Sequence, residues 1–257
     1  MDRTKVIKAI RRKLKNDKVS VGSWMQIPHP SIAEIMGAAG YDWVAIDMEH
    51  GSVSYQQLPD LFRSLELGKT LPLVRLSNGD KINCQQALDA GAGGVIVPMV
   101  ETASQLLSVK NACSWPPRGT RGIGFSRANL FGKNFNSYKN EAQSPILVAM
   151  IESITAIENL DEILLVDGLD AIMIGPYDLS ASLKILGKFN HRSFKSAINK
   201  ILIRSKKANI AAGLHVVNPS ENDLNISIKE GYRFLAYSID AVMLRNGTNI
   251  KLLNKKK

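Results

Sequence analysis

Eight short apolar runs recur along the chain, and their regular alternation with polar segments constrains the fold more than any other feature. The runs are VGSWM (21–25), WVAID (43–47), PLVR (72–75), GVIVP (94–98), ILVAMI (146–151), AIMI (171–174), IAAGL (210–214) and FLAYS (234–238). Apolar runs of this length, bounded by polar residues, are typical of buried strands in a parallel sheet. The sequence therefore predicts about eight strands.

Each predicted strand is followed by a segment with a helical pattern. These segments cover 30–39, 55–67, 80–90, 102–112, 155–165, 193–207, 220–230 and the residues from 239 onward. Thr102, Ser193 and Ser220 are N-cap residue types at the start of three of them. Strictly alternating strands and helices imply a parallel sheet, and about eight such units favour an α/β fold of the (β/α)8 TIM-barrel type. No Gly-x-Gly-x-x-Gly motif follows the first strand, which argues against a dinucleotide-binding open sheet.

We expect one TIM-barrel domain over residues 1–257, with an extra helix at the N-terminus. The chain contains no linker, internal repeat or low-complexity segment. Its opening segment, MDRTKVIKAIRRKLKNDK, is basic and lacks the apolar core of a secretory signal. No apolar run approaches the roughly 20 residues of a membrane span. With only two cysteines, in no paired motif, the sequence predicts a cytoplasmic protein without a membrane partner.

The formal net charge of +10 comes largely from the two ends of the chain, the opening segment and KLLNKKK at 251–257. A solvated surface with a basic tail explains it, because no aromatic residues are interleaved with arginine and no nucleic-acid-binding motif is present. We therefore expect no nucleic-acid partner, and nucleic-acid binding is the weaker alternative.

Polar and ionisable residues stand where the predicted strands end. In chain order they are Asp47, Glu49, His50, Arg75, Glu152, Asp178 and His215. The carboxyl ends of barrel strands meet at one rim, where active sites of this fold lie. Each residue also has a structural alternative: Glu152 can favour a helix N-terminus, Asp178 can serve in a turn, and His215 is best explained as a histidine of the core or one that supports the residues in contact with the substrate. Their joint arrival at one rim indicates an active site.

Glu152 and Asp178 follow neighbouring predicted strands and supply an oxygen-rich pair of ligands. Two carboxylates with open positions suit Mg2+ or Mn2+, since waters and substrate oxygens can complete the octahedron. A zinc site would require cysteine or more histidine. No predicted strand ends in lysine, which a Schiff-base aldolase needs. The residues favour a metal-dependent route over a lysine route.

Several longer segments resemble a known family. They are IDMEHG, PLVR, GGVIVPMVETASQ, WPPRGTRGIGFSRANLFG, VAMIESITAIENLDEIL and GLDAIMIGPYDLSASL, and the similarity runs from about Gly22 to about Leu244. The chain resembles the HpcH/HpaI aldolase/citrate lyase family, whose class II pyruvate aldolases are typified by 4-hydroxy-2-oxoheptanedioate aldolase. This resemblance implies a metal-dependent aldehyde-lyase that reversibly cleaves a 4-hydroxy-2-oxo acid to pyruvate and an aldehyde.

The resemblance also implies roles for individual residues. Glu152 and Asp178 match the two metal-binding carboxylates, for Mg2+ or Mn2+ with Co2+ as a third candidate. Arg75 matches the arginine that holds the pyruvyl unit and stabilises its enolate. His50, paired with Asp47, matches a catalytic dyad that acts as a base through a water.

The substrate-binding residues come from two further segments. Backbone groups of Gly175, Pro176 and Tyr177, up to Asp178, match those that meet the pyruvate carboxylate, and the 121–127 segment with Gly124 and Ser126 resembles the substrate loop of the family. Tyr177 stands where many members have alanine, the loop reads GFSRAN, and LHVVNP (214–219) also departs from the usual pattern. These departures concern the aldehyde and leave the pyruvate chemistry in place.

Two other readings stay open at the sequence level. A CoA-ester lyase of the citryl or malyl type shares the fold and the metal site, but no segment clearly predicts a CoA site. A non-catalytic binding protein could retain the barrel, although the intact set of strand-end residues argues against loss of activity. The resemblance further implies a trimer-based hexamer whose partners are a small 2-oxo acid and an aldehyde.

Overall fold

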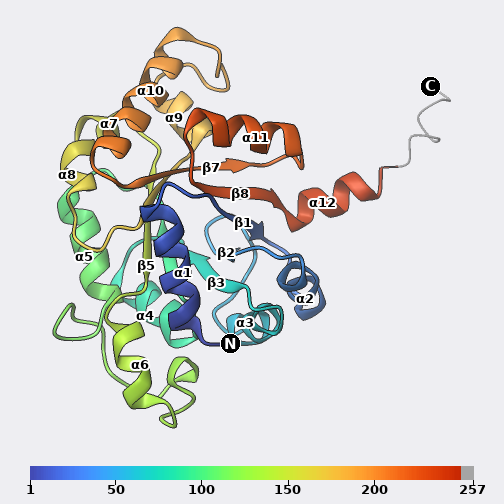
Figure 1. Ribbon diagram of the computed structural model, residues 1–257, viewed down its shortest axis with the longest axis vertical. Helices are drawn as coiled ribbons and strands as arrows, with labels where there is room; N and C mark the ends of the chain where they lie inside the picture. Colours follow the sequence, from blue (N-terminus) through green and yellow to red (C-terminus); the bar gives the residue numbers. More distant parts are fainter. Residues whose placement is uncertain (250–257) are drawn as a thin grey trace.

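The computed structural model describes residues 1–249 and contains a closed barrel of eight parallel strands in the order β1 to β8 (Figure 1). The strands are β1 (Ser20–Met25), β2 (Trp43–Asp47), β3 (Leu71–Arg75), β4 (Gly94–Val97), β5 (Ile146–Ile151), β6 (Ala171–Ile174), β7 (Ala211–Val216) and β8 (Phe234–Ile239). The predicted TIM barrel is confirmed, since all eight predicted runs form strands. The predicted basic tail at 251–257, and any part of the last predicted helix beyond 249, lie outside the described residues.

Helices alternate with the strands and surround the barrel. Those that the sequence predicted are α2 (Pro30–Ala38), α3 (Leu58–Leu67), α4 (Lys81–Asp89), α5 (Ala103–Cys113), α7 (Ile154–Glu158), α8 (Leu160–Leu164), α10 (Arg192–Lys207), α11 (Glu221–Glu230) and α12 (Asp240–Gly247). The segment 155–165 was predicted as one helix, but it is divided at Asn159, where α7 ends and α8 begins. In Figure 1, α12 points away from the barrel. Within residues 1–249 no helix has both the length and the apolarity to cross a membrane.

Three short elements were absent from the prediction. They are the 3-10 helix η1 (Arg127–Asn129) and the helices α6 (Phe135–Ala142) and α9 (Pro176–Ser182). Helix α9 begins directly after β6, with Gly175 as N-cap and Pro176 in the first turn. Proline is favoured there because the first helical N–H groups have no partner within the helix. This start places Tyr177 and Asp178 at the carboxyl end of the barrel.

Inward-facing residues fill the barrel and continue into its carboxyl end. Trp43 and Ala45 on β2 and Leu71 and Leu73 on β3 belong to one buried interior cluster. Side chains of a strand alternate between its two faces, so residues two positions apart share a face. By the same alternation, the side chains of Asp47 and Arg75 follow those of Ala45 and Leu73 toward the barrel axis, and these two residues are paired in the β2–β3 register.

Helix α1 (Arg3–Lys15) closes the amino-terminal end of the barrel. Its Ile7 and Ile10 are buried in the interior cluster, together with Trp43 and Phe234, the first residues of β2 and β8. The predicted N-terminal extra helix is therefore confirmed. One face of this helix is part of the core.

Candidate active site

A cleft of about 970 Å3 opens at the carboxyl ends of the strands. Among the residues predicted for the site, those that line it are His50, Arg75, Glu152, Gly175, Pro176, Tyr177 and Asp178. Asp47 lies directly behind them and bonds to Arg75. The structure thus brings together all the predicted catalytic and metal-binding residues.

Asp47 is a buried anion with every oxygen engaged. Its Oδ1 accepts hydrogen bonds from Arg75 Nε (2.9 Å) and its Oδ2 from Arg75 Nη2 (2.7 Å). Gln26 Nε2 donates to Oδ2 at 2.8 Å, and the backbone N–H groups of Glu49 and His50 donate to Oδ1. Burial raises the pKa of Asp47, but the bonds from Arg75 and Gln26 outweigh it and leave the pKa below its ordinary value. Asp47 therefore fixes the Arg75 guanidinium in one orientation.

Arg75 has two further neighbours. Its Nη1 lies 3.0 Å from Glu49 Oε2, and its Cζ lies 5.3 Å from the centre of the Trp24 ring. A guanidinium held by two carboxylates and an aromatic face has little freedom left, so it can meet a substrate without reorganising. Glu49 was recognised in the sequence as a strand-end residue, but no role was predicted for it.

The predicted pairing of His50 with Asp47 is not present in the structure. The His50 side chain is 66% exposed at the cleft, and its Nε2 lies 4.0 Å from Glu49 Oε2. Only the backbone N–H of His50 contacts Asp47, because an aspartate at the start of a turn accepts from the N–H groups two and three residues later. The imidazole is therefore beside Glu49, and the carboxylate of Asp47 belongs to Arg75.

Glu152 follows β5 and is only 4% exposed. Its Oε2 accepts a hydrogen bond from the Met99 N–H at 2.9 Å, while Ser153 caps α7, so capping is not the role of Glu152. A Cβ at position 175 would lie 2.3 Å from Glu152 Oε1, so the close approach of the two segments requires Gly175. Burial raises the pKa of Glu152 to about 7, and the negative charges of Glu49 and Asp178 contribute to the rise.

The carboxylates of the cleft fit a divalent cation. Asp178 lies in the first turn of α9, which follows β6, and Glu152 follows the neighbouring strand β5; both residues line the cleft. Burial also raises the pKa of Glu49. An excess of partly buried carboxylates is relieved by a bound cation, and two oxygen donors with open positions suit Mg2+ or Mn2+. No cluster of three or more His, Cys, Asp or Glu side chains arranged to hold a metal occurs within residues 1–249, so waters and substrate would have to complete the coordination.

Two cleft residues had no predicted role. Gln26 follows β1 and, two residues after the inward-facing Trp24, also points inward, where its side chain donates to Asp47. The backbone N–H groups of Gln26 and Ile27 each donate to the buried carboxylate of Asp240 at 2.9 Å. The same alternation could have identified Gln26 from the sequence, had it been followed one step past the strand.

His215 lies on β7 and lines the cleft; the sequence favoured a position in the core or one that supports the residues in contact with the substrate. Its ring stacks on that of Trp24, with ring centres 4.9 Å apart and planes 24° apart. Its Nε2 lies 2.9 Å from the carbonyl oxygen of Ser238 on β8. Burial lowers the pKa of His215 to about 4, so the ring is neutral at neutral pH.

Gly124 and Ser126 lie at the opposite end of the barrel. Their segment follows α5, and a segment that leads from a helix into the next strand lies at the amino-terminal end of the strands. The neighbouring Arg127 donates to the carbonyl of Ala90, the residue after α4. The structure therefore does not bring Gly124 or Ser126 to the cleft of their own chain.

The model of the HpcH/HpaI aldolase/citrate lyase family matches residues 20–247. The hydroxypyruvate/pyruvate aldolase of Roseobacter denitrificans is 36% identical to this chain over 242 residues, covering 93% of this chain and 94% of that protein. The 4-hydroxy-2-oxovalerate aldolase of Novosphingobium aromaticivorans is 34% identical over 246 residues, with coverages of 94% and 92%. The crystal structure of an HpcH/HpaI aldolase/citrate lyase family protein from Burkholderia cenocepacia superposes with a TM-score of 0.89 at 28% identity, over 97% of this chain and 99% of that chain.

Proposed function

Because this chain belongs to the HpcH/HpaI aldolase/citrate lyase family, we propose that it is a metal-dependent class II pyruvate aldolase. It reversibly cleaves a 4-hydroxy-2-oxo acid to pyruvate and an aldehyde, as an aldehyde-lyase. Relatives covering more than nine-tenths of the chain are named as aldolases. The observation that carries the proposal is the cleft itself, in which a fixed arginine, Arg75, faces the carboxylates of Glu152 and Asp178.

Glu152 and Asp178 would hold the cation, which we propose to be Mg2+ or Mn2+, with Co2+ as a third candidate. A bound divalent cation supplies Lewis-acid polarisation of the keto group of the 2-oxo acid. The segment of Gly175, Pro176 and Tyr177, up to Asp178, at the start of α9 receives the substrate carboxylate. The donors are the N–H groups of Tyr177 and Asp178, which lack partners within the first helical turn, whereas Pro176 has no N–H.

The remaining steps belong to the side chains of the chain. Arg75 offsets the negative charge that develops on the keto oxygen as the bond between C3 and C4 breaks, and Asp47 keeps its guanidinium in position for this. His50, beside Glu49, takes the proton of the 4-hydroxyl group through a water. The aldehyde then leaves, and protonation of the enolate gives pyruvate.

We extend the proposal to the setting of the enzyme. It is a cytoplasmic TIM-barrel domain over 1–257, a trimer-based hexamer, and has no nucleic-acid partner. Gly124 and Ser126 retain a substrate-binding role only if another copy presents its 121–127 segment to the cleft. The exposed side chains of Ile123 and Phe125 in this segment are compatible with such a contact.

The test is pyruvate release by the purified protein from short and long 4-hydroxy-2-oxo acids. Activity should be lost with EDTA and restored by Mg2+, Mn2+ or Co2+. If no substrate released pyruvate with any of these metals, the proposal would fail, and a CoA-ester lyase or a non-catalytic binding protein would be the next hypothesis. The same preparation assayed with citryl-CoA and malyl-CoA separates these two.

A further inference from the structure

Asp240 is a buried carboxylate that the proposed mechanism does not use. It is the first residue of α12, directly after β8, and it is only 5% exposed. Burial raises its pKa, and the nearby charge of Asp47 adds to the rise. A buried carboxylate close to a second one is stable only where hydrogen bonds hold it, so the partners of Asp240 indicate what it does.

Both oxygens of Asp240 hold the segment that follows β1. Its Oδ1 accepts a hydrogen bond from the Gln26 N–H and its Oδ2 accepts one from the Ile27 N–H, each at 2.9 Å. Oδ1 also accepts from the Ala241 N–H at 2.7 Å, within the first turn of α12. The carboxylate therefore fixes the backbone of the segment after β1 at two successive residues.

The pairing of β1 with β8 explains why a side chain is needed at this place. The register shifts between Gly22 and Trp24, and the last pair joins Trp24 to Ile239. Ser238 in β8 has a φ of 57°, a left-handed conformation that is uncommon for residues other than glycine. Irregularities of this kind re-aim side chains and are enriched next to active sites. Beyond the last pair, the side chain of Asp240 receives the two N–H groups in place of a strand backbone.

The side chain of Gln26 connects this backbone segment to the active site. Its Nε2 donates to Asp47 Oδ2 at 2.8 Å, and the same oxygen accepts from Arg75 Nη2 at 2.7 Å. Because a carboxylate only accepts hydrogen bonds, the amide of Gln26 must present its NH2 group to Asp47. An unbroken series of hydrogen bonds thus leads from Asp240 through Gln26 and Asp47 to Arg75.

We propose that Asp240 is a positioning residue for the reaction and that it acts on Arg75 through Gln26 and Asp47. Asp240 is not part of the cleft lining. It fixes the backbone of Gln26, the amide of Gln26 restrains Asp47, and Asp47 keeps the guanidinium where negative charge develops on the substrate. A donor held in this way stabilises the charge without reorganising. This inference rests on the proposed aldolase function and adds a residue from outside the cleft.

The experiment is a double-mutant cycle with the Mn2+-loaded enzyme and the 4-hydroxy-2-oxo acid that the wild type cleaves fastest. Asp240→Asn keeps the size of the side chain but replaces one of its two acceptors by an NH2 group. Gln26→Met keeps the length of the side chain and removes the donor to Asp47.

Each single variant should lower kcat about tenfold, the effect of one hydrogen bond. KM should stay within about twofold of the wild-type value, because Arg75 acts on charge that develops only in the transition state. If Asp240 acts through Gln26, then Asp240→Asn introduced into Gln26→Met should lower kcat by less than about twofold more.

Asp42→Asn is the matched control for the general stability of β1. Asp42 holds the opposite end of this strand, where it accepts from the Ser20 hydroxyl group at 2.8 Å and from the Val21 N–H at 3.3 Å. Asp42→Asn should lower the free energy of unfolding and leave kcat of the folded enzyme unchanged. This variant separates the loss of positioning in Asp240→Asn from a loosening of the whole strand.

Two kinetic results would overturn the inference. One is a wild-type kcat in Asp240→Asn. The other is a pair of losses that multiply in the double variant, because Asp240 would then act by a route that does not include Gln26.

If the wild type cleaved no substrate, the aldolase function would fail, and the crystal structure of Asp240→Asn would decide the role of Asp240. The amide of Gln26 should then lie beyond hydrogen-bond distance, about 3.5 Å, from Asp47. An amide still bonded to Asp47 in that variant would show that Asp240 does not position it.

Discussion

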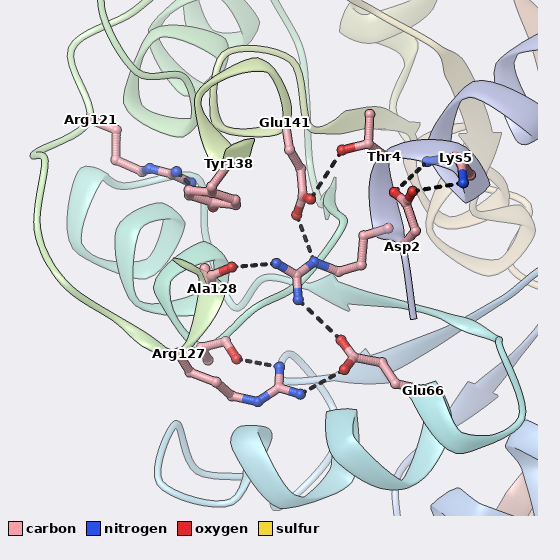
Figure 2. A network of polar contacts seen from close by, with 11 residues as sticks. Asp2, Thr4, Lys5, Glu66, Arg121, Arg127, Ala128, Tyr138 and Glu141 are labelled. Atoms are coloured by element: carbon pink, nitrogen blue, oxygen red, sulfur yellow. Dashed lines mark hydrogen bonds and ion pairs between the residues drawn. The ribbon is translucent and has the colours of Figure 1, made fainter. Parts of the chain in front are cut away.

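The two ends of the barrel both bury charged side chains, but they balance the charge differently. At the amino-terminal end, two arginines face two glutamates (Figure 2). Arg3 contacts Glu141 at 2.6 Å and Glu66 at 3.2 Å, and Arg127 contacts Glu66 at 2.9 Å. At the carboxyl end, Arg75 stands among four carboxylates, those of Asp47, Glu49, Glu152 and Asp178.

The difference separates a structural network from a functional one. Arg3, Glu66, Arg127 and Glu141 join α1, α3, η1 and α6, so matched charges connect segments that are distant in sequence. A buried charge without a partner costs several kcal/mol, and an excess of one sign persists only where a ligand compensates for it. The excess of carboxylates at the carboxyl end therefore points to a bound cation.

The largest effect is expected for Glu152→Gln. Removal of this carboxylate should lower kcat/KM for aldol cleavage at least about 1,000-fold, because it takes away a proposed cation ligand. Without added metal the free energy of unfolding should stay the same or rise, since a buried, partly repelled carboxylate is replaced by a neutral group. Steady-state kinetics and urea unfolding measure the two effects. If Glu152→Gln were destabilised but fully active, the carboxylates at the carboxyl end would be structural, and the distinction between the two ends would be wrong.

At the amino-terminal end, Arg3→Met should lower the stability of the protein and leave its activity unchanged. It leaves Glu141 buried without its closest cation, so the free energy of unfolding should fall by about 3 kcal/mol while kcat of the folded enzyme is unchanged. The matched control is Lys5→Met, which removes a pair with Asp2 that is 84% exposed on the lysine side and should cost under about 0.5 kcal/mol. Equal losses in the two variants would mean that the network of Figure 2 contributes little.

Arg75→Lys tests whether geometry or charge matters in the cleft. Lysine keeps the charge but cannot make the two parallel bonds from Nε and Nη2 to Asp47. We expect kcat/KM to fall about 100-fold with a small change in the affinity for metal. Steady-state kinetics measure kcat/KM, and calorimetry measures the affinity for metal. If the positive charge alone were sufficient, kcat/KM of Arg75→Lys would be near the wild-type value.

A smaller effect concerns the pH dependence of stability. Because the pKa of His215 is lowered to about 4 in the folded protein, the unfolded chain binds a proton on this residue first as the pH falls. The stability present above pH 6.5 should therefore be lost between about pH 6.5 and 4, by about 3 kcal/mol from this residue. Urea unfolding across this range should show a shallower decline for His215→Phe. If stability declined equally with falling pH in the wild type and in His215→Phe, His215 would not be buried as a neutral ring.

The strand-end residues could be predicted because periodicity and chain order determine them. A strand that starts with an inward-facing Trp43 must direct Asp47 inward, and β3 does the same for Arg75. The bonds from Arg75 to Asp47 were not predicted, because the family resemblance pairs Asp47 with His50, while the register of β2 against β3 places Arg75 beside Asp47.

The position of the 121–127 segment could have been predicted from the order of the segments along the chain. The segment follows the helix predicted at 102–112, and this order alone places it at the amino-terminal end of the barrel. The family resemblance suggested that the 121–127 segment contacts the substrate. It did not indicate which end of the barrel of its own chain the segment occupies. The short helix α9 was missed because Gly-Pro-Tyr-Asp also fits a turn.

The most direct test of the central claim is calorimetric titration of Mn2+ into the wild-type protein, Glu152→Gln and Asp178→Asn, without substrate. The excess of carboxylates at the carboxyl end predicts one Mn2+ per chain in the wild type and a loss of binding of at least about tenfold in each variant. Mn2+ binding of equal strength in all three proteins would contradict the claim.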